Sequence, residues 1–124
     1  KIFDTHLFDQ THLKVKSDEG FQPINAIHST RPYLEWKIKT KTGKTLICAD
    51  HHVFYDENFK KIRASELYNG DKIQTEDGIE EIEYSIFTEN ISSMYDIAVM
   101  SINHRYYTNG LLSSNTVMSG IFIT

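Results

Sequence analysis

Short runs rich in β-branched and aromatic residues recur along the whole chain, with Gly-containing turn pairs between them. The runs have strand length and alternate apolar with polar side chains, which favours half-buried β-strands. Thr42-Gly43 and Asp77-Gly78 are typical of hairpin turns, and Asn69-Gly70 and Asn109-Gly110 indicate two further turns. The pattern predicts an all-β fold of many short strands. The predicted strands are residues 13–16, 22–28, 33–40, 45–48, 72–75, 80–87, 94–100 and 104–108.

One segment, residues 63–68, has helical character, because Ser65 has an N-cap side chain and Glu66 follows it in the first turn. We expect one short helix or turn there, ahead of the strand at 72–75. The length of 124 residues suits one compact domain, and 40% hydrophobic residues suffice for a core.

Composition excludes several classes of partner. The net charge is −4 with acidic and basic residues mixed, so no basic face for nucleic acid is predicted. No apolar run approaches the length of a membrane span, and no signal-peptide pattern is found, so we expect a soluble cytoplasmic protein. The adjacent Asp50, His51 and His52 lack a second ligand cluster, so neither a metal site nor any cofactor is predicted.

The last part of the chain contains a dipeptide with self-cleaving potential. The side-chain amide of Asn115 can attack its own peptide carbonyl, closing a succinimide and breaking the bond to Thr116. The hydroxyl of Thr116 can first accept an acyl group as an ester. Asn followed by Thr is a common dipeptide, so the surrounding segments decide whether it is meaningful.

Four segments precede this dipeptide in a fixed order: residues 46–54, 61–71, 94–99 and 104–110. In order and spacing they resemble the motifs of inteins, the self-excising protein elements. The first contains Cys48-Ala49-Asp50-His51 where the family usually has Thr-x-x-His, the third carries Asp96, and the fourth combines His104, aromatic residues and an Asn-Gly turn. The resemblance covers residues 15–115.

The resemblance implies a Hint-type fold, a flattened horseshoe of many short strands with both splice junctions near its centre. Residues 1–115 are then the intein part, and residues 116–124 belong to the downstream extein, the host sequence that follows an intein. Only the strands and turns already described lie between the central and terminal motifs. This leaves no room for a homing endonuclease and predicts a mini-intein.

The resemblance also assigns roles at the downstream junction. Asn115 is the residue that cyclises, and Thr116 is the acyl acceptor. Ser114 stands where many inteins have His, which places more of the proton transfer on His104 of the neighbouring strand. The alternative for His104 is a half-exposed strand histidine beside Arg105.

At the upstream junction, the resemblance makes His51 the histidine that protonates the leaving nitrogen. In a strand, the adjacent His52 would face the opposite side, so only one of the two can point into the site; the Asp-His spacing favours His51. Cys48 is either a weak substitute for the usual Thr hydroxyl or a plain core residue. Asp96 either tunes the first nucleophile or is a strand-edge residue held by a backbone hydrogen bond.

One motif of the family is missing. Inteins open with Cys or Ser, whereas this sequence opens with Lys1, which cannot perform the first acyl shift. We therefore expect the C-terminal fragment of an atypically split intein, whose partner is a short N-terminal intein fragment carrying the Cys or Ser; truncation is the alternative. Together they would perform single-turnover trans-splicing between two exteins. The rival functions are a Hint-type autoprocessing domain without ligation and a non-catalytic β-sandwich binding module.

Overall fold

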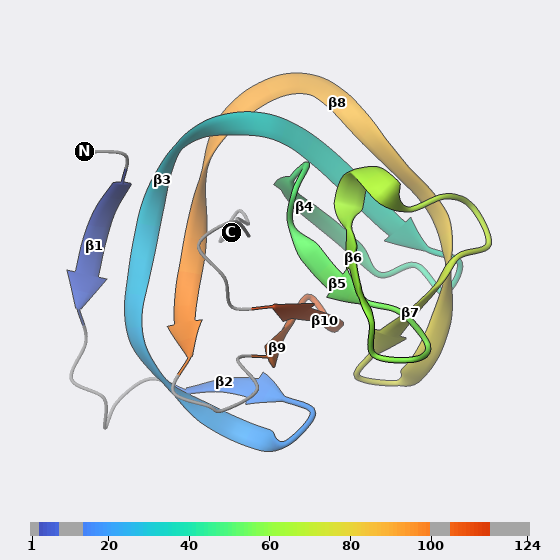
Figure 1. Cartoon of the computed structure of the whole chain (residues 1–124), viewed down its shortest axis with the longest axis horizontal. Coiled ribbons are helices and arrows are strands. Elements are labelled where there is room, and N and C mark those ends of the chain that lie inside the picture. The colour runs from blue at the N-terminus through green and yellow to red at the C-terminus, as the bar shows by residue number, and fades with distance from the viewer. Residues whose placement is uncertain (1–2, 8–13, 100–104, 115–124) are drawn as a thin grey trace.

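The computed structural model describes residues 3–7, 14–99 and 105–114. Within these ranges most residues lie in antiparallel strands, and the only helical element is one turn of 3-10 helix (Figure 1). The strands are β1 (Phe3–Leu7), β2 (Lys14–Ser17), β3 (Gly20–Thr40), β4 (Thr45–Ala49), β5 (Val53–Tyr55), β6 (Lys61–Arg63), β7 (Lys72–Thr75), β8 (Gly78–Val99), β9 (Arg105–Thr108) and β10 (Leu111–Ser114); the helical turn is η1 (Ala64–Glu66). The predicted all-β class is confirmed.

Two long strands, β3 and β8, form the curved ribbon that arches over the shorter strands in Figure 1. They have 21 and 22 residues and pair antiparallel from Ile24 opposite Val99 to Thr40 opposite Ile82. Each long strand joins two of the runs that the sequence presented as separate strands. The predicted runs therefore lie in strands, but several of the predicted strand ends fall in the interior of β3 or β8.

Local irregularities let these strands continue through a proline and through a residue with a positive φ. The pairing shifts register between Ser29 and Pro32, where the missing N–H of proline can be tolerated. It shifts again between Leu34 and Trp36, opposite the part of β8 that contains Glu89 with a positive φ of 71°. Such bulges bend a strand, which fits the curvature of the arch.

The last strand lies in the middle of the sheet rather than at its edge. β10 pairs with β9 from Leu111 opposite Thr108 to Ser114 opposite Arg105. It also pairs with β7 through Leu111 and with β5 through Ser113. In Figure 1, β9 and β10 lie beneath the arch. Three neighbouring strands therefore hold β10 along its length.

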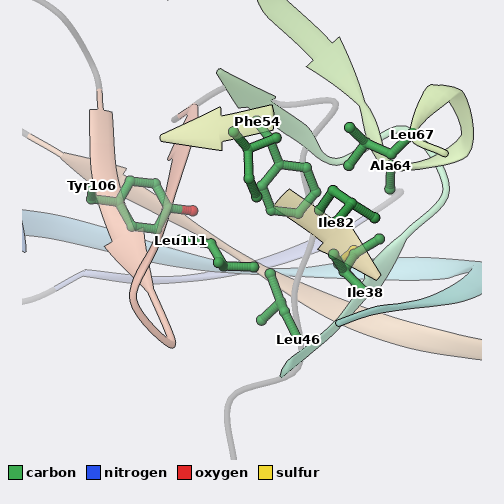
Figure 2. Packing of buried hydrophobic residues seen from close by; sticks show 10 residues of the cluster. Ile38, Leu46, Phe54, Ala64, Leu67, Ile82, Tyr106 and Leu111 are labelled. Carbon is green, nitrogen blue, oxygen red and sulfur yellow. The ribbon is translucent and has the colours of Figure 1, made fainter. Parts of the chain in front are cut away.

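The core fills the space between the arch and these shorter strands. Figure 2 shows aliphatic side chains from β3, β4 and β8 meeting aromatic side chains from β5 and β9. Burying such side chains is the main favourable contribution to folding. The fully buried members are Ile38, Cys48, Phe54, Ala64, Ile73, Ile82, Tyr106 and Leu111.

A partly buried ionic cluster, here called the turn clamp, joins three hairpin turns and consists of Lys44, Asp77 and Glu80. The Lys44 ammonium lies 2.7 Å from the Asp77 carboxylate and 2.6 Å from that of Glu80, and these contacts raise the pKa of Lys44. The Lys44 stem packs against the turn between β9 and β10, where a Cβ on Gly110 would lie 2.9 Å from Lys44 Cε. The N–H of Glu76 donates to the Gly110 carbonyl at 2.8 Å. The clamp thus fixes the far end of the terminal hairpin.

The predicted helix is one turn, η1, and its expected cap at Ser65 is wrong. The Arg63 N–H donates to the Glu66 carboxylate at 2.9 Å, so Glu66 satisfies this end of the turn. The Ser65 N–H instead donates to the Asp50 carbonyl. In the described part of the chain, no helix has the length and apolar character needed to cross a membrane.

Candidate functional site

The loop with the two adjacent histidines connects β4 to β5. Asp50, His51 and His52 lie in a turn, so the expected strand alternation does not apply to them. Backbone hydrogen bonds hold the loop on two sides: the Asp50 N–H donates to the Leu34 carbonyl at 3.1 Å, and the His52 carbonyl accepts from the Ala64 N–H at 2.9 Å. The loop is therefore fixed against both β3 and η1.

Of the two ring nitrogens of His51, only Nδ1 has a hydrogen-bond partner among the described residues. Its Nδ1 lies 3.2 Å from Asp50 Oδ1, and its ring meets the Tyr33 ring edge-on with 4.5 Å between centroids. The side chain is only 11% exposed, yet Nε2 has no hydrogen-bond partner among the described residues. A carboxylate on Nδ1 favours the tautomer in which Nε2 can accept a proton, and the protonated ring can donate one. This geometry is compatible with proton transfer at Nε2.

His52 turns its ring toward the terminal hairpin. Its Nε2 lies 2.8 Å from the Ser113 hydroxyl oxygen of β10, and its ring meets the Phe54 ring at 4.7 Å. The Ser113 hydroxyl is in turn 2.6 Å from that of Thr108 on β9. All three polar side chains are buried. The two histidines therefore have separate neighbours, and His52 connects the loop to the last strand.

Ser114 ends β10 and is almost fully buried. Its partner in the pairing is Arg105, whose guanidinium contacts the Asp18 carboxylate at 2.7 and 3.2 Å. Asp18 belongs to the turn between β2 and β3, so this ion pair fastens the open end of the terminal hairpin to the arch. The turn clamp and this ion pair hold the hairpin at both ends.

Cys48 lies in β4 opposite Trp36 and has no exposed surface. Burial raises the pKa of its thiol well above the ordinary value, and the nearby Asp50 carboxylate raises it further. The thiol is therefore protonated at neutral pH and inaccessible. It packs in the same cluster as Ile38 and Leu46, which favours the core reading that the sequence left open.

Comparison with known proteins gives a clear answer for the fold. No family model and no curated protein matches the sequence. Among solved structures, the VidaL intein superimposes with a TM-score of 0.78 and 29% identity, covering 86% of this chain and 70% of that one. A consensus engineered intein with an atypical split site gives 0.72 and 25%, covering 93% and 89%; the gp41-1 intein gives 0.71 and 21%, covering 92% and 98%. This chain has the Hint fold of inteins.

The predicted Hint class is thus confirmed, and the intein neighbours support a Hint splicing domain. Within this fold, the structure brings the His51 loop against the strand that ends at Ser114. Asp96 lies in β8, paired with His28 of β3, and its side chain is outside the described part. His104, Asn115 and Thr116 also lie outside the described residues, so their roles stay predictions.

The sequence did not reveal two residues that contact the candidate site, Tyr33 and Ser113. Tyr33 belongs to a run that looks like an ordinary strand, and Ser113 follows two leucines in a short apolar stretch. Their contacts with the loop join segments that are far apart in the chain, so no local spacing points to them. The terminal Asn-Gly turn was the only available signal, since it predicts that the strand after it folds back.

Proposed function

We propose that this Hint domain is the C-terminal fragment of a split intein and splices in trans with a short N-terminal intein peptide. The observation that carries the proposal is the hydrogen bond between His52 and Ser113, which holds the central-motif loop against the strand that ends one residue before Asn115. Two sequence segments with cleavage motifs thereby meet in a fold whose structural neighbours are inteins.

The proposed reaction ends at the Asn115–Thr116 bond. The Thr116 hydroxyl oxygen attacks the upstream acyl carbon and displaces the sulfur or oxygen of the first nucleophile, which takes the proton. The Asn115 amide nitrogen then attacks its own carbonyl, forming a succinimide and releasing the Thr116 amine. This amine displaces the ester oxygen, which recovers a proton and leaves a peptide bond between the exteins. None of these steps calls on a cofactor or metal.

His51 is the proposed acid for the upstream step. Its Nε2 is buried and has no hydrogen-bond partner within the described ranges, which supports this role, because a positioned imidazole can donate a proton to the leaving nitrogen. At the downstream junction, the last described pair of the hairpin is Arg105 and Ser114; His104 directly precedes Arg105 in sequence, and Asn115 directly follows Ser114. This register supports a role for His104 in polarising the Asn115 carbonyl, with Ser114 beside it.

The first nucleophile comes from the partner peptide in this proposal. Cys48, the one thiol of the chain, is buried and protonated, so it is unsuited to start the reaction. A structural neighbour described as a consensus intein with an atypical split site makes a split arrangement reasonable for this fold. The partner peptide would supply Cys or Ser and, ahead of it, the upstream extein. Asp96 is proposed to tune that nucleophile.

Intact-mass spectrometry tests the proposal. The full chain is incubated alone and with Cys- or Ser-initiated N-terminal intein peptides that carry an upstream tag. We expect a product joining the tag to residues 116–124, and a residual chain that ends in the succinimide of Asn115. Asn115→Ala should abolish release of residues 116–124, because an alanine side chain cannot cyclise.

The matched control is Asn58→Ala, which removes a surface asparagine from another turn and should splice like the parent. Cleavage without joining would overturn trans-splicing and leave an autoprocessing Hint domain. An unchanged mass with every peptide would overturn the splicing proposal and leave a binding module.

A further inference from the structure

A chain of buried hydroxyl and imidazole groups runs from the central loop through the last strand. It consists of His52, Ser113 and Thr108, with 2.8 Å between His52 Nε2 and Ser113 Oγ and 2.6 Å between the two hydroxyl oxygens. His52 and Ser113 have no exposed surface, and Thr108 has little. Apolar side chains could fill this volume at a lower desolvation cost, so the polar chain calls for an explanation beyond packing.

On the loop side, the position of the His52 ring is determined by its surroundings. The backbone N–H of His52 donates to the Ala49 carbonyl at 3.1 Å, and its carbonyl accepts from the Ala64 N–H at 2.9 Å. The Phe54 ring lies against the imidazole at an angle of 63°. With backbone and ring both held, a shift of Ser113 cannot be absorbed by a rotation of His52 without loss of contacts.

On the strand side, Ser113 sits where β10 is most constrained. It pairs with Phe54 of β5 on one side and with Tyr106 of β9 on the other. It lies two residues before Asn115 in sequence. Its hydroxyl can accept the N–H of His52 and donate to Thr108, or the reverse in the other tautomer.

We infer that His52 is a positioning residue that couples the two cleavage sites. Its bond to Ser113 fixes the distance between the loop that carries His51 and the strand that leads to Asn115. The two junctions are then held in one geometry, and loss of the bond slows both cleavages. The inference rests on the proposed function for the two cleavages themselves, but the coupling between them depends on the contact of His52 with Ser113.

The experiment is a double-mutant cycle of His52→Leu and Ser113→Ala. Upstream cleavage is measured with a Cys-initiated peptide and added thiol, and downstream cleavage by release of residues 116–124, both at a temperature where all variants are folded. Each single variant should slow both steps about five- to tenfold, the rate equivalent of one hydrogen bond. The double variant should be no slower than the slower single variant.

Two variants separate positioning from other roles. His52→Gln keeps an amide donor at a similar reach and should recover most of the lost rate in both steps. His51→Ala should slow the upstream step alone, because it removes the proposed acid but leaves the coupling. Ser17→Ala is the matched control, since it removes another buried hydroxyl, one that donates to the Gly20 carbonyl at 2.7 Å, and should change neither rate.

Several outcomes would overturn the inference. Rate losses that multiply in the double variant would mean that His52 and Ser113 act independently. Loss of the upstream step alone in His52→Leu and His52→Gln, with Ser113→Ala unaffected, would make His52 the acid. If the parent chain splices with none of the peptides, the proposed function fails; if it splices and the cycle is additive, only the coupling fails. Should His52→Leu not fold, Ser113→Ala alone tests the coupling, because it removes the same hydrogen bond and should still slow both steps.

Discussion

Cys48 illustrates how one buried side chain can separate two interpretations that the sequence left open. Its thiol is enclosed in the core and its pKa is raised by burial, so it should be unreactive while the chain is folded. We expect iodoacetamide to alkylate it only after unfolding in urea, as mass spectrometry can follow. Cys48→Ala should lower the free energy of unfolding by about 1–3 kcal/mol.

The upstream cleavage rate of Cys48→Ala should stay close to that of the parent, rather than fall by the roughly 10²-fold expected for loss of an acid–base group. Rapid alkylation of the folded chain, or such a rate loss, would assign Cys48 to the site instead of the core.

The histidine pair marks the limit of prediction at the scale of single residues. Spacing favoured His51, and the open Nε2 of His51 agrees with that interpretation without testing its role. The expectation that only one of the two histidines can point into the site came from alternation along a strand. Such alternation does not apply here, because both residues lie in a turn. What distinguishes them is contact with Tyr33 and Ser113, and neither contact is encoded in local sequence.

Between elements, the contact of Lys44 with the turn at Gly110 has the clearest consequence. Gly110 has a φ of 84°, and an added Cβ would lie 2.9 Å from Lys44 Cε. Gly110→Ala should therefore lower the free energy of unfolding in urea for two reasons. The left-handed backbone accounts for about 1–2 kcal/mol, and overpacking against Lys44 for about 1–3 kcal/mol. Downstream cleavage should slow as the terminal hairpin shifts.

Gly43→Ala separates these two costs. Gly43 has a φ of 103° in the turn between β3 and β4, and open space surrounds the position of its Cβ. This variant should show the backbone cost alone. Equal losses of stability in the two variants would mean that Lys44 moves aside freely and that the turn clamp does not constrain the hairpin.

Strand positions were largely predictable, whereas strand ends were not. The runs at 72–75 and 45–48 match β7 and nearly match β4, because turn residues bound them on both sides. The prediction divided the long strands at residues 29–32, which include Pro32, and at residues 88–93, which include Glu89 with its positive φ. Bulges in the pairing absorb both, and bulges leave no reliable trace in a single sequence.

For the molecule as a whole, two buried carboxylates predict loss of stability in acid. The hydrogen bond from Thr88 lowers the pKa of Glu35 despite its burial, with help from Ser92 and Asn90. Burial raises the pKa of Glu80, but hydrogen bonds from Lys44 and neighbouring threonines outweigh it and the pKa is lowered. A carboxylate whose pKa is lower in the folded state stabilises the fold at pH values above its unfolded-state pKa, here 4.5. This contribution is lost as the pH falls from there through the folded-state pKa.

Urea unfolding between pH 7 and pH 3 checks this. The free energy of unfolding should change little at neutral pH and fall below about pH 4.5, the ordinary glutamate range. Glu35→Gln should make that fall less steep, because one linked proton is removed, whereas the exposed Glu57→Gln should leave it unchanged. A profile that is equally steep in all three proteins would show that other groups cause the acid sensitivity.

The sheet order is the part of the architecture that no local pattern gives. Composition and alternation predict an all-β domain, and the family motifs predict the Hint horseshoe, but the order β1-β3-β8-β7-β10-β5-β6 depends on pairings between distant strands. The central place of β10 is an example: its run of four residues reads like any short edge strand, and it is buried because β5, β7 and β9 all pair with it.

The arch has a consequence for when the domain can form. Ile24 of β3 pairs with Val99 of β8, so the first long strand leaves the ribosome well before its partner has been translated. Pairings over such separations form slowly and late. A nascent chain therefore carries one unpaired edge of β3 until β8 emerges, although β1, β2 and β4 can already pair with β3 elsewhere. The order of synthesis thus sets a delay, and chemistry that needs the closed arch begins only after that delay has passed.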